Sequence, residues 1–335
     1  MDALPRRMGA ANRVNVLLIY RHNRRCIAHF YRRAFQQLGH TVMTVGPWDD
    51  SEPLGTEGRE PHVTLPWRYA PESLYAWDEI VFAVRYARHY GPSNGPAIKE
   101  AKSFPLNACV KILIDGGEGL QVHGIPDPWI HVAIEGVGLG WSKTPHKFAQ
   151  IPCNNRQPGV TWLPPGFDVE EHYRGNRVPF YDIGQVAANR MSRQFVWKEV
   201  QRLAPDLHCL FRDGLWGWPY AEAHRNMRAT FACAGMEFVT MRVMEAMAMG
   251  CFVLADRSER MRELFEPGVH YIEFESIKHP DCDERIPDPK WLVETALQLR
   301  RNFATDRAME FAAYTLVQQK HSWQHRARTL LEAVA

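Results

Sequence analysis

The sequence lacks the cysteine patterns of secreted and metal-binding proteins. It holds seven cysteines in 335 residues, an odd number, and no two of them form a C-x-x-C pair. This usage argues against a disulfide framework and against a zinc site. It favours cysteines that pack as small apolar residues in a reducing compartment.

Long hydrophobic runs are also missing. The apolar stretch VNVLLIY, residues 14–20, is too short to cross a membrane, and it lacks the length and cleavage site of a signal peptide. From these observations we expect a cytoplasmic protein without a membrane span.

A large net charge of one sign is absent as well. The formal charge is +2, so the molecule as a whole is not a binder of polyanions. Residues 1–48 nevertheless contain eight arginines and one acidic residue, Asp2. This local excess indicates either a phosphate-bearing partner or a solvated helix face.

The length and composition suit two ordinary globular domains. A chain of 335 residues, 45% hydrophobic and 23% charged, fits two domains of roughly 150 residues each. Strand and helix patterns alternate along the chain. In the N-terminal half we expect strands at 14–20, 40–47, 111–115 and 131–136, a strand leading into a turn at 161–168, and helices at 24–38 and 74–90.

The alternation resumes after a turn-rich segment at 164–179, where we place the domain boundary. We expect further strands at 181–187 and 251–256, and helices at 191–203, 219–229, 241–249, 288–303 and 305–334. The predicted domains are 1–170 on the acceptor side, 171–315 on the donor side, and a last helix, 316–335, crossing back to the first domain.

Alternating strands and helices on both sides of one boundary predict an α/β protein with two doubly wound, Rossmann-like domains facing a cleft. In such sheets ligands bind beyond the carboxyl ends of the strands, so we expect a site in that cleft.

The segment from 235 to 275 is the most informative. Met241–Met249 reads as a short helix that Gly250 ends before a buried strand. A helix N-terminus attracts anions such as a diphosphate, and Glu245, one turn inside, can accept hydrogen bonds from ribose hydroxyls. Glu237 lies eight positions earlier, in the loop that leads to the helix.

This segment resembles the donor-binding region of retaining glycosyltransferases of the GT-B fold, and more narrowly the spore-maturation-type glycosyltransferases. The resemblance rests on five stretches: RVMEAMAMGCFVL (242–254), ELFEPGVHYIEF (263–274), WLPPGFDVEEHY (162–173), HSWQHRARTLLEAV (321–334), and the opening RVNVLLIY with LGHTV. Together they cover about half of the chain.

The resemblance implies roles for several residues. Glu245 would bind the ribose of the nucleotide, and Glu237 would reach the donor sugar or its phosphate. Arg190 and Arg193 fall where the family keeps basic residues for the diphosphate, a group that the guanidinium fork suits. The reaction would retain the anomeric configuration and need no metal.

One stretch departs from the family pattern. Between the two glutamates the family often has a glycine loop that approaches the phosphates, whereas this chain has FVTMR, residues 238–242. We therefore place Thr240, Met241 and Arg242 on the donor site in place of that loop. The methionines of this helix are also expected to pack in the core.

Aromatic residues offer a partner for the nucleotide base. Trp216 and Trp218, in RDGLWGWPY, suit stacking on a base, and we assign Trp216 to the donor site. The alternative is that both rings are buried without touching a ligand.

Candidate catalytic groups follow the strands of the first domain. His22 follows the first strand, and Asp115 ends the KILID strand, so either could face the cleft and act on an acceptor hydroxyl. Asp115 could equally only cap a turn. With Glu237, these residues form the predicted catalytic set.

The arginines at the first strand–helix turn suggest an acceptor. Arg21, Arg24 and Arg25 could contact acceptor phosphates, as in DNA, or form a solvated face. Transfer to a hydroxylated base of viral DNA, flipped out of the stack, is the corresponding hypothesis.

No metal ligand and no tightly bound cofactor are predicted. The D-x-D sequence at 281–283 lies in a polar, proline-rich loop rather than after a hydrophobic strand, and EGVGLG at 135–140 lacks the full dinucleotide spacing. The expected donor substrate is a nucleoside-diphosphate sugar, with UDP as the nucleotide.

The sequence therefore predicts a glycosyltransferase that moves a hexose from this donor to a hydroxyl acceptor. Two rivals remain open. One is a sugar-nucleotide epimerase of the same architecture, and the other is a non-catalytic protein that binds nucleic acid or nucleotides through its arginines.

Overall fold

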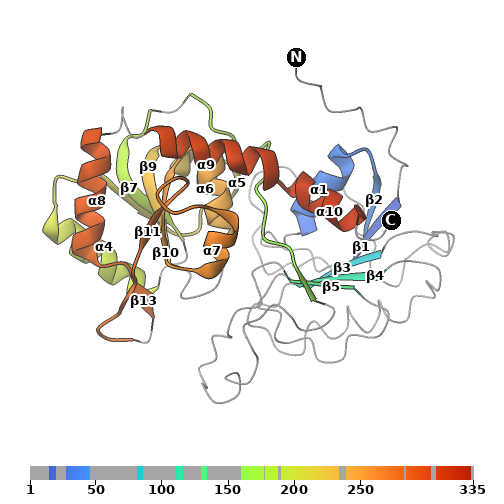
Figure 1. The fold of residues 1–335 in the computed structure, drawn as a ribbon, viewed down its shortest axis with the longest axis horizontal. Coiled ribbons are helices and arrows are strands. Elements are labelled where there is room, and N and C mark those ends of the chain that lie inside the picture. The colour runs from blue at the N-terminus through green and yellow to red at the C-terminus, as the bar shows by residue number, and fades with distance from the viewer. Residues whose placement is uncertain are drawn as a thin grey trace. The chain divides into compact units, whose positions relative to one another are not determined.

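A computed structural model gives the fold as two compact units (Figure 1). One unit comprises Met1–Gly117, Gln121–Val132 and Leu330–Ala335, and the other comprises Glu118–Leu120 and Ala133–Thr329. The structure describes residues 15–19, 28–45, 81–85, 111–115, 130–133, 160–176, 178–187, 190–233, 239–282, 284–302 and 307–332. The domain limits predicted from the sequence stay predictions.

The first sheet has six strands in the order β2-β1-β3-β4-β5-β6. Its strands are β1 (Asn15–Ile19), β2 (Thr41–Val45), β3 (Val81–Arg85), β4 (Lys111–Asp115), β5 (Ile130–Ala133) and β6 (Val160–Trp162). Strand β1 pairs in parallel with both β2 and β3, and β3 pairs in parallel with β4. The helix α1 (Ala28–Gln37) joins β1 to β2, as the parallel register requires.

The opening β-α-β unit confirms the sequence prediction. Buried Val16 and Leu18 of β1 and Tyr31 and Phe35 of α1 supply its apolar residues. Gly39 follows the helix with φ +88°, the left-handed conformation that suits glycine at a helix end.

The predicted helix at 74–90 is wrong at its centre. Residues 81–85, VFAVR, form strand β3, which lies between β1 and β4. The apolar spacing of this segment fits a helix, but its valines and phenylalanine also fit a strand buried between two others. Hydrogen bonding of this segment to β1 on one side and to β4 on the other therefore decided that it is a strand.

The second sheet has five strands in the order β11-β10-β9-β7-β8, and each strand is parallel to its neighbours in the sheet. Its strands are β7 (Tyr181–Val186), β8 (Cys209–Arg212), β9 (Met227–Ala232), β10 (Phe252–Asp256) and β11 (Ile272–Phe274). A short antiparallel pair, β12 (Ile277–Lys278) with β13 (Arg285–Ile286), follows.

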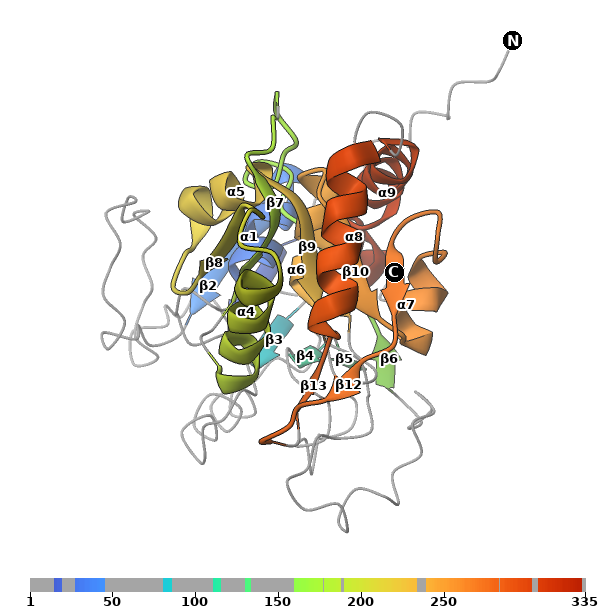
Figure 2. The ribbon, with the colours of Figure 1, turned by 90° about the vertical axis from the view of Figure 1, so that its left-hand side faces the viewer.

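Helices cover both faces of this sheet, as in a doubly wound fold. The helices α4 (Met191–Leu203) and α8 (Pro289–Asn302) lie side by side over one face, as Figure 2 shows. On the other face α6 (Met241–Ala248) packs against β9 and β10 and against α9 (Arg307–Lys320). The helices α5 (Gly217–Arg225) and α7 (Glu259–Leu264) also belong to this unit.

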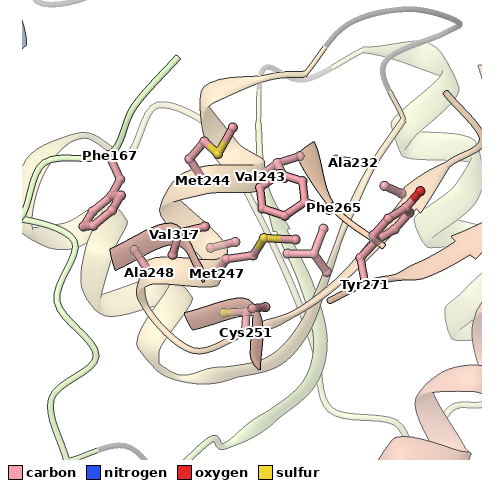
Figure 3. Close-up of a cluster of buried hydrophobic side chains, with 14 of the residues drawn as sticks. Phe167, Ala232, Val243, Met244, Met247, Ala248, Cys251, Phe265, Tyr271 and Val317 are labelled. Atoms are coloured by element: carbon pink, nitrogen blue, oxygen red, sulfur yellow. The ribbon is translucent and has the colours of Figure 1, made fainter. Parts of the chain in front are cut away.

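The core under α6 is rich in methionine, as predicted. Met244, Met247 and Met249 are fully buried, and Figure 3 shows Met244 and Met247 in a cluster with Phe265 and Val317. Flexible thioether side chains fill irregular space between helices, which suits the junction of α6, α7 and α9. This packing fixes α6 in the domain.

The predicted last helix, 305–334, is two helices. Helix α9 ends at Lys320, and α10 (Trp323–Glu332) begins after His321 and Ser322. The turn that follows β6 inserts at this break: the Phe167 amide donates to the carbonyl of His321 at 3.1 Å, and the Trp323 amide donates to the carbonyl of Phe167 at 3.1 Å. The break thus supplies hydrogen bonds to a segment about 150 residues away in sequence.

Glycine is needed at this contact. A Cβ on Gly166 would lie 2.8 Å from the Trp323 nitrogen and 2.9 Å from the Ser322 carbonyl carbon, closer than backbone atoms tolerate. Arg326 of α10 reinforces the contact, donating to the carbonyl of Pro164 at 2.6 Å. No helix among the described residues is long and apolar enough to cross a membrane.

Candidate functional site

Helix α6 carries the central carboxylate of the candidate site. Glu245 is the fifth residue of α6, between the buried side chains of Met244 and Ala246, and only 5% of its surface is exposed. Burying a carboxylate is unfavourable unless it is hydrogen-bonded or paired. The neighbours of Glu245 therefore decide its chemistry.

Two residues from other elements face the Glu245 carboxylate. Tyr220, from α5, donates its hydroxyl to Oε2 at 2.5 Å. His172, in the segment that follows Phe167, places Nε2 at 3.8 Å from Oε1. The rings of His172 and Tyr220 meet edge to face with centroids 6.0 Å apart, so the three side chains form one cluster.

Burial raises the pKa of Glu245 to about 7, because the charged form loses its hydration. The Tyr220 hydrogen bond and the positive charge of Arg242 lower this pKa, whereas the negative charges of Glu171 and Asp168 raise it. Burial, together with the adjacent Glu245, raises the pKa of Tyr220 well above its ordinary value, so Tyr220 stays a hydrogen-bond donor. Glu245 thus exchanges a proton near neutral pH.

Arg242 lies one turn before Glu245 but directs its hydrogen bond elsewhere. Its Nε donates to the carbonyl of Val186 at 3.0 Å, at the carboxyl end of β7. Among the described contacts, Arg242 makes no hydrogen bond to Glu245. It acts on that carboxylate through its positive charge, which lowers the pKa of Glu245. This arrangement ties the start of α6 to the edge of the sheet where ligands bind in such folds.

Thr240 and Met241 begin helix α6. Thr240 is the N-cap residue, but its hydroxyl makes no capping hydrogen bond and, within the described chain, no other hydrogen bond although it is buried. Met241 is half-buried. Their donor-binding role stays a prediction.

Arg190 and Arg193 lie at the start of α4, after β7. Arg190 is the N-cap residue, its side chain is 43% exposed, and Nη1 lies 3.3 Å from Oε1 of Glu284. The hydroxyl of Ser192 donates to the same Glu284 carboxylate. Arg193 is half-buried. A diphosphate at this position would compete with Glu284 for Arg190.

The two tryptophans are exposed, so the alternative of burial is wrong. Trp216 is 46% exposed and Trp218 is 52% exposed. The guanidinium of Arg225 lies over Trp218 at 4.4 Å and over Tyr173 at 4.6 Å. Trp216 is the N-cap residue of α5, and stacking of a base on it stays a prediction.

Several predicted residues lie outside the described part of the chain. They are Arg21, His22, Arg24, Arg25 and Glu237. Asp115 is the last residue of β4, paired with Arg85 of β3, and only its backbone is described. The catalytic and acceptor-binding sets thus stay predictions.

The D-x-D segment follows β12. The amide of Asp281 donates to Nδ1 of His279 at 3.0 Å, and Asp283 lies outside the described residues. Within the described ranges, no group of three or more histidine, cysteine, aspartate or glutamate side chains is arranged to hold a metal ion.

Sequence reasoning missed Tyr220 and His172. Both fall in segments that were singled out, Tyr220 in RDGLWGWPY and His172 in WLPPGFDVEEHY, but no spacing pattern joins them to Glu245. Their sequence separations from it are 25 and 73 residues. Only the packing of α5, α6 and the turn brings the three together.

Comparisons with known proteins agree with this fold. Residues 170–332 match the model of a family described as glycosyl transferase-like. A glycosyltransferase from Rickettsia africae has 11% sequence identity and a TM-score of 0.60, and the match covers 96% of this chain and 98% of that one. No curated protein matches the chain in sequence.

Two further solved structures are similar over the same extent. Sucrose-phosphate synthase from Thermosynechococcus elongatus has 13% identity and a TM-score of 0.57, with 96% and 98% of the two chains covered. Anabaena Alr3699/HepE, solved in complex with UDP-glucose, has 10% identity and a TM-score of 0.56, with 96% and 99% covered. The chain has the GT-B fold of these glycosyltransferases, and its residues 170–332 match the glycosyl transferase-like family.

Proposed function

We propose that the chain is a glycosyltransferase, that it takes its sugar from a UDP-sugar, and that Glu245 accepts a hydrogen bond from the ribose. One observation carries the proposal: Oε1 of this buried carboxylate receives no hydrogen bond within the described chain, whereas Oε2 is bound by Tyr220. The carboxylate as a whole is buried and has lost much of its hydration, and a ligand hydroxyl that donates to Oε1 would offset part of that loss.

The nucleotide assignment draws on the similar fold of HepE, whose solved complex contains UDP-glucose. In a doubly wound sheet the ligand lies beyond the carboxyl ends of the strands. Arg242 is attached to that end of β7 through Val186, and Arg190 follows the same strand. We assign the diphosphate to Arg190, Arg193 and the start of α6, with Thr240 and Met241 beside it.

For the remaining machinery we retain the roles expected from the sequence. Glu237 contacts the sugar or its phosphate, Trp216 stacks on the base, and His22 or Asp115 acts on the acceptor hydroxyl. The leaving diphosphate is stabilised by guanidinium groups and helix dipoles, and no step is assigned to a metal.

For the acceptor we retain the hypothesis of a hydroxylated base in DNA, held through Arg21, Arg24 and Arg25. Contacts to phosphates make binding steeply salt-dependent. Filter binding with hydroxymethylated and plain DNA tests this hypothesis. Absence of DNA binding even at low salt would exclude it and leave the donor assignment unaffected.

The donor assignment is tested by calorimetry with UDP, GDP and ADP on wild type, Glu245→Ala and Glu273→Ala. Glu273 is the control because it also receives a tyrosine hydrogen bond, from Tyr271, but lies on β11. We expect Glu245→Ala to weaken UDP binding by roughly tenfold to a hundredfold, as for lost hydrogen bonds to a charged group. Glu273→Ala should leave it within about twofold.

Equal binding by wild type and Glu245→Ala would contradict the proposal. Incubation of a UDP-sugar with the protein in the absence of an acceptor separates the rival activity. Conversion of the donor into its epimer would establish an epimerase, whereas transfer that requires an added acceptor supports the transferase.

A further inference from the structure

One turn, residues 168–173, carries three of the groups that surround the Glu245 carboxylate. Nε2 of His172 lies 3.8 Å from Oε1, and the negative charges of Asp168 and Glu171 raise the pKa of Glu245. The turn is bonded within itself, because the Asp168 amide donates to Nδ1 of His172 and Oδ1 of Asp168 accepts from the Glu171 amide, each at 3.1 Å. The position of this turn therefore decides what surrounds Glu245.

Arg225, the last residue of α5, is bonded to the backbone of this turn. Its Nη1 donates to the carbonyl of Glu171 at 3.4 Å and to the carbonyl of Tyr173 at 3.3 Å. Nη1 carries two hydrogens, one for each carbonyl. Because the two carbonyls flank His172, one guanidinium nitrogen secures the backbone on both sides of the residue that faces Glu245.

The guanidinium of Arg225 is itself held in one orientation. Oε2 of Glu222, on the same helix, accepts from Nε at 3.4 Å and from Nη2 at 3.3 Å. The guanidinium also lies over the rings of Tyr173 and Trp218, at 4.6 and 4.4 Å from their centroids. Only 8% of the Arg225 side chain is exposed, so its hydrogen bonds are weakened less by solvent than those of a surface arginine.

We propose that Arg225 is a positioning residue of the candidate site, which fixes the 168–173 turn beside Glu245 by bonding to the backbone on both sides of His172. These hydrogen bonds end on carbonyls of the turn, so the effect on Glu245 passes through the backbone and needs no contact with a substrate. The expected effect on UDP binding rests on the proposed function, whereas the effect on Glu245 does not.

The segment around the turn stays attached when the Arg225 bonds are lost. Before the turn, the Phe167 amide donates to the carbonyl of His321 at 3.1 Å. After the turn, Arg174 pairs with the buried carboxylate of Glu310 on α9 at 2.5 Å. Removal of Arg225 should therefore loosen the middle of the turn and leave the fold in place.

Loosening of the turn changes the pKa of Glu245 in a defined direction. The groups that face this carboxylate are Asp168, Glu171 and His172 of the turn, Tyr220 of α5, and Arg242 of α6. When the turn moves away, water reaches the carboxylate and two acidic charges recede, and both changes lower the pKa of Glu245 from about 7. A loss of global stability alone would not change this pKa.

The first test compares four proteins in two pairs: wild type with Glu245→Gln, and Arg225→Met with Arg225→Met/Glu245→Gln. Urea titrations across pH give the difference in free energy of unfolding within each pair. This difference rises from about pH 4.5 and levels off near the folded-state pKa of Glu245, about 7 in wild type. In the Arg225→Met pair it should level off at a lower pH and after a smaller rise.

Arg228→Met, paired with its own Glu245→Gln variant, is the matched control. Arg228 is also a largely buried arginine in an ion pair, but its Nη1 donates to Asp182 of β7 at 2.5 Å. The control should be less stable than wild type and should still level off near pH 7.

Two milder variants carry the test if Arg225→Met does not fold. Arg225→Lys keeps the positive charge and can reach one of the two carbonyls, and Trp218→Leu removes one ring and keeps the guanidinium. Each, with its Glu245→Gln partner, should shift the levelling-off in the same direction as Arg225→Met and by less.

Calorimetry with UDP gives a second readout on the same proteins. Arg225→Met should weaken UDP binding by roughly threefold to tenfold, because the turn no longer holds the surroundings of Glu245 in place. Arg225→Lys should recover part of this loss, and Arg228→Met should bind UDP within about twofold of wild type.

Contrary results separate the two parts. If the levelling-off does not move in the folded Arg225 and Trp218 variants, or moves equally in Arg228→Met, the positioning role is wrong. It is also wrong if wild type binds UDP and Arg225→Met binds it equally well. If wild type binds none of UDP, GDP and ADP, the donor assignment fails, and the pH result still decides the role of Arg225.

Discussion

Two tyrosine–glutamate pairs in the C-terminal unit have the same chemistry and opposite electrostatics. Tyr220 donates to Glu245 at 2.5 Å, and Tyr271 donates to Glu273 at 2.9 Å. The pKa of Glu245 is raised to about 7, first by burial, whereas the pKa of Glu273 is lowered, first by its hydrogen bonds from Arg262.

The difference lies in where the arginine that acts on each carboxylate directs its hydrogen bonds. Arg262 donates from Nε to Oε2 of Glu273 at 2.8 Å and from Nη2 to the other oxygen. Arg242 donates to the carbonyl of Val186 instead. Both oxygens of Glu273 thus receive hydrogen bonds, whereas Oε1 of Glu245 receives none within the described chain, and the proposed ligand role of Glu245 rests on this contrast.

The largest expected effect is on the pH dependence of stability. The folded state holds the Glu245 proton more tightly than the unfolded state, so this residue lowers stability as pH rises from about 4.5 to about 7. The shift corresponds to roughly 3 kcal/mol. Urea titrations should show that the free energy of unfolding of Glu245→Gln, relative to wild type, rises by roughly 3 kcal/mol between about pH 4.5 and about pH 7.

Glu273→Gln should give the opposite sign. Its folded-state pKa is lowered, so its stabilisation is present above the ordinary carboxyl pKa and is lost as pH falls through the folded value. The variant should be less stable than wild type at neutral pH, with the gap closing in acid. If the stability of both variants relative to wild type changed in the same direction with pH, the contrast between Glu245 and Glu273 would be wrong.

An intermediate effect is expected at the arginines. Arg242→Met leaves the buried carbonyl of Val186 without its donor and should destabilise the fold by about 1–3 kcal/mol. It should also move the Glu245 transition above pH 7, because a positive charge that lowers this pKa is lost.

The control is Arg262→Met, which removes a pair near the surface. It should destabilise the fold less than Arg242→Met does, because an exposed ion pair is screened by solvent. Denaturant midpoints measured across pH check both effects, and an unmoved Glu245 transition in Arg242→Met would show that its charge does not reach the carboxylate.

The smallest effect is expected at Glu284, the partner of Arg190. This exposed pair contributes about 0.2–1 kcal/mol. If Arg190 binds the diphosphate, Glu284→Gln frees it, and UDP affinity should rise about two- to fivefold. Calorimetry on Glu284→Gln and on Glu275→Gln, a control whose partner is Arg257, measures this gain. Weaker UDP binding in Glu284→Gln would mean that Glu284 supports the site rather than competes for it.

Local sequence patterns were sufficient to predict two of the helices that cover the second sheet. The predicted helix at 191–203 coincides with α4, and that at 241–249 coincides with α6 plus its C-cap residue, Met249. Periodic apolar residues and end signals specify such helices. Strand β9 was missed, because the predicted helix at 219–229 ran past Arg225 into MRATFA, a segment that pairs with β7 and β10.

The sequence by itself determined the fold class, because strand and helix patterns alternate along the chain. It also determined the buried methionine face of α6 and the position of Glu245, because these follow from spacing within one helix and its flanking glycine. Tertiary structure alone decided that β3 is a strand, that the last helix breaks at His321, and that Tyr220 and His172 face Glu245. The physical reason is that strand pairing, backbone insertion and side-chain hydrogen bonds join residues far apart in the chain, and no local periodicity encodes those contacts.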